Sequence, residues 1–85
     1  MTAGAPVDER RVLEAIRRGV AVVVPEIEPA AVTPERTLAE LGCNSIDRAE
    51  IVTLAMEELG IVVPVRELQQ GRDVGSLVDV IRKHS

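Results

Sequence analysis

The chain contains no phenylalanine, tyrosine or tryptophan among its 85 residues. Apolar residues still make up 46% of it, so any core must be built from aliphatic side chains. A chain of this length forms one small domain, and we expect a single domain over residues 1–85 with an ordered core over about 7–83. Without a basic, aromatic surface, the sequence gives no indication of nucleic-acid binding.

Cysteine and histidine occur once each, as Cys43 and His84. A single cysteine excludes an internal disulfide and a cysteine-based zinc site, and His84 has no partner placed to form a catalytic triad. We therefore expect no metal site, no catalytic residue and no enzymatic activity. His84 is interpreted as an exposed terminal residue. Cys43 could act as a nucleophile near a helix start, but we favour a small, partly buried loop residue.

Long hydrophobic runs are also absent. No stretch approaches the roughly 18 apolar residues of a membrane span, and the N-terminal MTAGAPVDERR lacks the residue order of a signal peptide. We expect a cytoplasmic protein that does not bind membranes.

The negative charge is concentrated in the middle of the chain. The formal charge is −4, and residues 38–68 alone carry six acids and two bases, while residues 1–37 carry −1 and residues 69–85 carry +1. A negative field of this kind repels phosphates and favours basic protein surfaces. A solvated helix face that keeps the protein soluble is the alternative.

Helical periodicity predicts an all-α fold, a four-helix bundle with a long first loop and a short third helix. A first helix begins at Asp8, with the apolar positions Val12, Leu13, Ile16, Val20, Val23, Val24 and Ile27. A proline-rich connection runs from there to about Asn44, and we expect it to add Leu38 and Leu41 to the core.

The second helix is predicted to begin at Asn44 or Ser45 and to end at Gly60 in a left-handed cap. Its predicted core stripe consists of Ile51, Leu54, Ala55 and Leu59, and its outward acids are Asp47, Glu50, Glu57 and Glu58. A short helix over 64–70, closed by Gly71, and a last helix over 74–83 complete the fold. The last helix is expected to bury Leu77, Val78 and Ile81.

The stretch LGCNSIDRAEI, residues 41–51, places Ser45 where the second helix starts. Asn44 followed by Asp47 three residues later is typical of a helix cap, and Gly42 is expected to form a turn with positive φ. Because Asn44 can cap the helix, the Ser45 hydroxyl is left to face solvent. A phosphate there would lie at the positive end of a helix. Serine at a helix start is also common without any function, so the residues alone leave both interpretations open.

Three segments, LAELGCNSIDRAEIV, EELGIVVP and VGSLVDVI, resemble the acyl carrier proteins of fatty acid and polyketide synthesis. The resemblance runs from about residue 7 to residue 81, and its characteristic positions are Leu41, Gly42, Ser45, Ile46, Glu50, Ile51, Gly60, Ile61 and Pro64. It implies a four-helix carrier in which 4′-phosphopantetheine from coenzyme A is attached to Ser45, between Asn44 and Ile46. The terminal thiol of that group would carry acyl thioesters between enzymes.

The resemblance also implies partners. They are a phosphopantetheinyl transferase and loading enzymes of the acyltransferase or ketosynthase type, bound by a monomeric carrier. The implied recognition surface on the second helix consists of Ile46, Asp47, Arg48, Ala49, Glu50, Thr53 and Glu57. The run NSIDRAEI is similar to the stand-alone carriers of polyketide β-branching, which implies delivery of an acetyl group to an HMG-CoA synthase-like enzyme. A peptidyl carrier protein and an unmodified helical adaptor with the same fold stay open as alternatives.

Three residues depart from the family pattern. Asn44 stands where an aspartate is usual, which removes a charge that the transferase could use. Arg48 adds a cation to a surface that is usually neutral or acidic, either as a determinant of partner choice or as an exposed residue paired with a neighbouring acid. Ala55 replaces a larger aliphatic residue, and we expect it to enlarge an inner pocket or leave a cavity.

Overall fold

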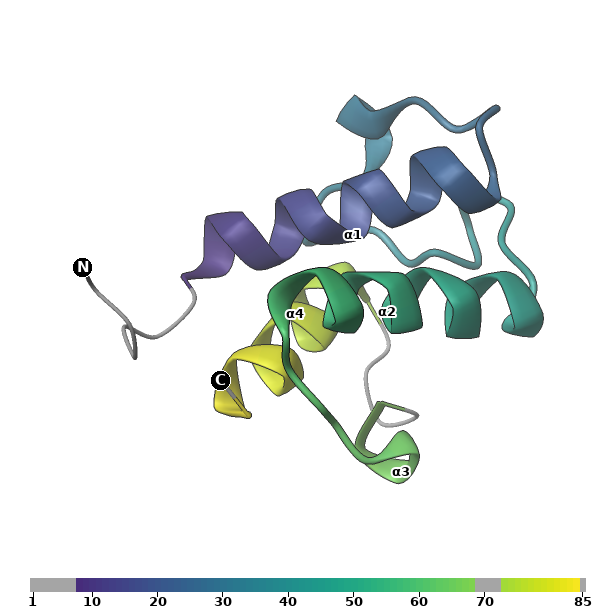
Figure 1. Ribbon diagram of the computed structural model, residues 1–85. Helices are drawn as coiled ribbons and strands as arrows, with labels where there is room; N and C mark the ends of the chain where they lie inside the picture. Colours follow the sequence, from purple (N-terminus) through teal and green to yellow (C-terminus); the bar gives the residue numbers. More distant parts are fainter. Residues whose placement is uncertain (1–7, 69–72, 85) are drawn as a thin grey trace.

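The computed structural model describes residues 8–68 and 73–84. Its elements are α1 (Glu9–Val23), the 3₁₀ helix η1 (Pro29–Ala31), α2 (Ser45–Leu59), α3 (Val65–Leu68) and α4 (Val74–Lys83). Helix α1 packs against both α2 and α4, and the short α3 contacts α4 (Figure 1). The two described ranges contain no strand, so the predicted all-α bundle is confirmed. None of the helices in them is long and apolar enough to cross a membrane.

Helix α1 starts and stops where its capping and proline residues dictate. The Asp8 carboxylate accepts a hydrogen bond from the Arg11 backbone N–H at 2.9 Å, which satisfies one free donor of the first turn. The helix ends at Val23. Val24 has φ −133°, outside the helical range, because the α conformation is disfavoured for a residue that precedes a proline. The apolar spacing that continues to Ile27 therefore lies in the following turn, where Ile27 still packs against the core.

The core is purely aliphatic apart from one cysteine. Leu38 is buried at 2% exposure and Leu41 packs against the core from the long loop, as predicted. Leu54 is only half-buried, whereas Val52 is buried and was not predicted to be. The fully buried larger side chains are Ile16, Ile51, Ile81, Val12, Val20, Val32, Val74 and Val78.

Helices α1 and α2 cross at close range. A Cβ atom built on Gly19 would lie 3.0 Å from the Ile51 carbonyl oxygen and 3.3 Å from its Cγ2 atom. At the neighbouring position, Arg18 forms an ion pair with Glu58, with its Nε atom 2.9 Å and 3.0 Å from the two carboxylate oxygens. Gly19 thus permits the contact that fixes α2, and the ion pair lies beside it.

The long loop is fastened to the start of α4. Its backbone carbonyls at Arg36 and Pro34 accept hydrogen bonds from the N–H groups of Val74 (2.8 Å) and Gly75 (3.0 Å). A Cβ atom at Gly75 would lie 3.1 Å from the Pro34 oxygen, a tight contact that glycine avoids. These bonds hold the loop that leads into α2.

The C-terminal end differs in one respect from the sequence expectation. His84 is an exposed residue, as predicted, but its Nε2 atom lies 2.8 Å from the Glu67 Oε1 atom. This contact ties α3 to the end of α4. Helix α3 is described as far as Leu68, and the predicted end of the short helix at Gln70 and Gly71 lies outside the described residues.

Candidate functional site

The turn before α2 places Ser45 at the end of the bundle. Gly42 has φ 112°, the positive value predicted for it and one that other residues rarely adopt. The next N–H, that of Cys43, donates to the Leu38 carbonyl at 3.0 Å, and Leu38 is anchored in the core. This hydrogen bond to a core residue fixes the turn, and Asn44 and Ser45 follow directly after it at the start of α2.

Asn44 and Asp47 form the predicted capping box. The Asp47 N–H donates to the Asn44 Oδ1 atom at 2.7 Å, and the Asn44 N–H donates to the Asp47 Oδ2 atom at 3.2 Å. Asp47 is half-buried in this arrangement. One carboxylate oxygen of Asp47 thus accepts a backbone hydrogen bond. Asp47 therefore stabilises the helix start and is less available to a partner than a fully exposed acid.

Ser45 is the first residue of α2 and is exposed. Its hydroxyl has no hydrogen-bond partner within the described part of the chain. The cap is supplied by Asn44, so the hydroxyl is free to react. The first N–H groups of a helix lack helical acceptors and favour an anion. A phosphate ester on Ser45 fits this position in both chemistry and exposure.

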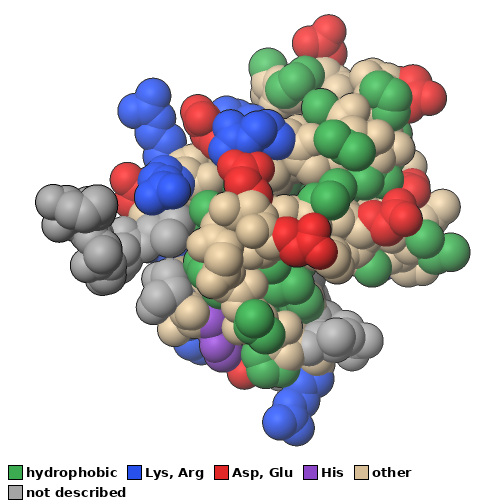
Figure 2. Space-filling view, viewed as in Figure 1, with side chains coloured by type: hydrophobic (Ala, Val, Ile, Leu, Met, Phe, Trp, Pro, Cys, Tyr) green, Lys and Arg blue, Asp and Glu red, His purple; other side chains and the backbone are tan. Residues whose placement is uncertain are grey.

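An outward face of α2 extends from the serine. An α-helix turns by about 100° per residue, so Ile46, Glu50, Thr53 and Glu57 fall within about 60° of one another and Ala49 lies at their border. All five are exposed, and Ile46 is 70% exposed although it is apolar. Figure 2 shows acidic and hydrophobic side chains along this part of the molecule, with basic side chains mainly toward the left and lower edges. We call these five residues the outward face.

Arg48 belongs to the same helix but not to the outward face. The same rotation places it about 160° from Glu50 and only about 60° from Ser45. It is exposed, and it forms no ion pair with any described residue. The predicted pairing with a neighbouring acid is therefore not found within those ranges.

Glu58 differs from the other acids of α2. It is exposed, as predicted, but the Arg18 Nε–H donates a bifurcated hydrogen bond to both of its carboxylate oxygens, and the Arg18 Nη2 atom donates to Oε2. These bonds hold the pKa of the Glu58 carboxyl below its ordinary value. Arg18 of α1 compensates the charge of Glu58. The acids of α2 that stay available to a basic partner are therefore Glu50 and Glu57.

Cys43 is buried at 5% exposure, which agrees with the loop-residue interpretation. Burial raises the pKa of its thiol, and the charge of Asp47 raises it further. The thiolate is the nucleophilic form of cysteine, so this environment opposes a role as nucleophile.

Val62 is an exposed apolar residue that the sequence did not single out. It is 86% exposed, between Ile61 and Val63, which are both buried. The alternation of buried and exposed side chains is characteristic of extended backbone. The alternation in the IVVPV segment, residues 61–65, is the signal in the sequence that could have indicated the exposed position.

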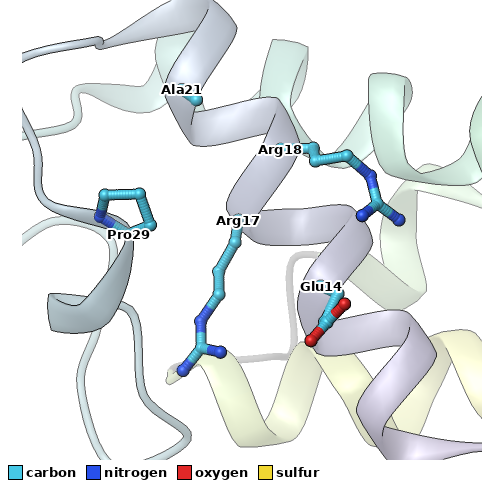
Figure 3. A pocket seen from close by; sticks show the side chains of 5 residues that line it. All are labelled: Glu14, Arg17, Arg18, Ala21 and Pro29. Atoms are coloured by element: carbon cyan, nitrogen blue, oxygen red, sulfur yellow. The ribbon is translucent and has the colours of Figure 1, made fainter.

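A surface hollow of about 180 Å³ lies between α1 and η1 (Figure 3). Its lining residues are Glu14, Arg17, Arg18, Ala21 and Pro29. Arg17 and Arg18 leave α1 in different directions. The first donates from Nε to the Val32 carbonyl at 3.0 Å, and the second pairs with Glu58. Both cations thus have structural partners. Ala55 is fully buried in the core and does not line this hollow.

The chain is similar in sequence to a known family and to several known proteins. The family model described as "Phosphopantetheine attachment site" matches residues 12–81. The polyketide biosynthesis acyl-carrier-protein AcpK of Bacillus subtilis (strain 168) is 36% identical over 74 residues, which cover 87% of this chain and 90% of that protein. The meromycolate extension acyl carrier protein of Mycobacterium leprae (strain TN) is 32% identical over 74 residues, 82% of this chain and 64% of that relative.

A solved structure shares the fold. It is the crystal structure of the curacin biosynthetic pathway HMG synthase in complex with acetyl donor-ACP, and one of its chains matches with a TM-score of 0.80 and 31% identity. The match covers 91% of this chain and 99% of that chain.

Proposed function

Because the chain belongs to the acyl carrier proteins, the family of the phosphopantetheine attachment site, we propose that Ser45 is the residue to which 4′-phosphopantetheine is attached. The observation that supports this most directly is the free, exposed hydroxyl of Ser45 at the start of α2, next to a cap that Asn44 provides. The other serine near a helix start, Ser76, is half-buried and follows the cap residue Asp73 at the start of α4.

The attachment requires little from this chain. The Ser45 oxygen bonds to the phosphorus that carries pantetheine in coenzyme A, the pyrophosphate P–O bond breaks, and adenosine 3′,5′-bisphosphate leaves with the proton passing to a base of the transferase. The bound group supplies a terminal thiol that holds an acyl group as a thioester. The chain itself contributes the position of the serine, its exposure and the surface that enzymes bind.

Mass spectrometry tests the attachment. Incubation with coenzyme A and a broad-specificity phosphopantetheinyl transferase is expected to add the mass of one phosphopantetheinyl group. Ser45→Ala should remove this gain, whereas the matched control Ser76→Ala should retain it. Modification of Ser45→Ala, or no modification of the natural chain by any transferase, would refute the assignment.

The protein acts in polyketide biosynthesis, and we propose that it donates an acetyl group to an HMG synthase-like enzyme of β-branching. Support comes from AcpK as a relative along nearly its whole length, and from the structural match to a complex of HMG synthase with acetyl donor-ACP. The exposed Ile46 beside Ser45 would enter an apolar depression of the partner, while Glu50 and Glu57 would meet basic side chains. Charge attraction of this kind gives fast and exchangeable association.

Two experiments test this proposal. The acetyl-loaded protein should transfer its acetyl group to an HMG synthase-like enzyme, and equally efficient use by a malonyl-dependent chain-extension system would contradict it. Glu50→Lys should lower the association rate severalfold at low salt, with less effect at high salt. Glu28→Lys makes the same change of charge on the long loop and serves as the control, since Glu28 is also exposed. Equal effects of the two substitutions would show that net charge, rather than the outward face, is recognised.

A further inference from the structure

Arg48 is the cation nearest to Ser45 along α2. Residues three apart on a helix are surface neighbours, with Cβ atoms about 5–6 Å from each other. The Arg48 side chain is exposed and has no ion-pair partner within the described ranges. It lies beside the serine around the helix axis and outside the outward face.

The direction of the side chain brings its charge closer still. Helical side chains lean toward the N-terminus of their helix, so Arg48 extends over the first turn of α2. Cys43 supports this: burial raises the pKa of its thiol, and the positive charge of Arg48 partly offsets the rise. The guanidinium charge therefore acts on the residues immediately before Ser45.

The remaining groups around Ser45 leave room for an anion. The residue before the serine, Asn44, is neutral. The only carboxylate in the first turn is Asp47, and its Oδ2 atom accepts from the Asn44 N–H at 3.2 Å. The cap and first turn of α2 thus carry one negative charge, on Asp47, and the positive charge of Arg48 lies beside them.

We propose that Arg48 is a positioning residue for the prosthetic group, whose phosphodiester it binds once that group is attached to Ser45. This inference rests on the proposed attachment. Arginine suits the role because its planar guanidinium can donate two parallel hydrogen bonds to phosphate oxygens. The bond holds the base of the arm against the first turn of α2, on Arg48's side of the helix. The outward face, with Ile46 and Glu50, stays clear for the partner enzyme.

The test compares apo and holo protein without any partner. In ¹⁵N-edited NMR spectra, the Arg48 Nε–H resonance should shift on conversion to the holo form, and the shift should diminish at high salt. The change in Tm on attachment should also be more favourable for the natural chain than for Arg48→Gln, by about 2–4 °C. Mass spectrometry first confirms that each variant is fully converted to the holo form, so differences in modification rate do not affect the comparison.

Two further variants separate charge position from charge number. In Arg48→Gln/Ala49→Arg the cation moves to the residue four positions after Ser45, again a surface neighbour, and the Tm change should be restored. In Arg48→Gln/Thr53→Arg the cation lies about 12 Å from Ser45 along the helix axis, so the Tm change should not be restored. Both replaced residues are exposed.

The results have distinct meanings. If holo protein forms on Ser45 but the Arg48 resonance does not shift and the Tm change is the same in Arg48→Gln, the positioning role is refuted while the attachment stands. Restoration by Thr53→Arg would equally refute it, because a general charge effect would then suffice. If no holo protein forms, the proposed function itself fails.

Discussion

The substitution Gly19→Ala tests the packing of α1 against α2. Alanine is the better helix former, so at an ordinary position inside α1 it would stabilise the protein by about 0.5–1 kcal/mol. At Gly19 the added methyl group would lie 3.0 Å from the carbonyl oxygen and 3.4 Å from the Cα atom of Ile51. Both are backbone atoms in the middle of α2, which a change of rotamer cannot move.

The magnitude follows from these opposing effects. Inserting a methyl group into a packed contact typically costs about 1–3 kcal/mol. After subtraction of the gain in helix propensity, we expect a net loss of about 1 kcal/mol in the free energy of unfolding. For a domain of this size that corresponds to a fall of about 4–8 °C in Tm.

Urea unfolding followed by far-UV circular dichroism measures the effect, since the chain lacks the aromatic residues needed for intrinsic fluorescence. Ala21→Gly is the matched control, because it makes the reverse change at an exposed position of the same helix. It should cost about 0.5–1 kcal/mol through helix propensity alone. If Gly19→Ala proved as stable as the natural chain, or more stable, the close crossing of α1 and α2 would be disproved.

Four further outcomes are expected. Asn44→Ala should lower the free energy of unfolding by about 0.5–2 kcal/mol through loss of the α2 cap, as measured in urea, and Asn44→Asp should lose little. Gly60→Ala should cost about 1 kcal/mol in the same assay because Gly60 has φ 70°. The Glu58 pKa is lowered in the folded state by hydrogen bonds from Arg18, so its stabilising effect is present above about pH 4.3 and is lost as pH falls further. Glu58→Gln or Arg18→Gln should therefore reduce the loss of stability on acidification; an unchanged acid profile would contradict this. Cys43 should be alkylated far more slowly in the native protein than in urea, and similar rates would exclude its burial.

The helices and the start of the site were predictable because their signals are local. The cap residues Asp8 and Asn44 lie next to the helices they cap, and the glycines with positive φ follow or precede helices at short range. The start of α2, with Ser45 exposed beside an independent cap, follows from residues 42–47 alone. Such features depend on hydrogen bonds between residues that are close in sequence, so the order of the residues is enough to predict them.

Features that depend on the tertiary arrangement were not predictable. Val32 stands alone in a proline-rich loop without periodicity, yet it is fully buried. Val52 and Ile51 are adjacent in sequence and both buried, because the buried side of α2 is wider than a single stripe. Arg18 and Glu58 are separated by 40 residues, and only the crossing of α1 and α2 brings them together.

The burial of Cys43 has a consequence for the cargo. Thiolates attack thioesters: the sulfur adds to the carbonyl carbon and the original thiol leaves, so an acyl group migrates between sulfur atoms at little energetic cost. A reactive cysteine two residues before Ser45 would lie within the sweep of an arm attached there and could strip it of its acyl group. Cys43 is the chain's only cysteine, is 5% exposed and has a raised pKa, so it stays out of this exchange. In a carrier loaded at Ser45, transfer of the acyl group to the chain's own cysteine is thereby disfavoured.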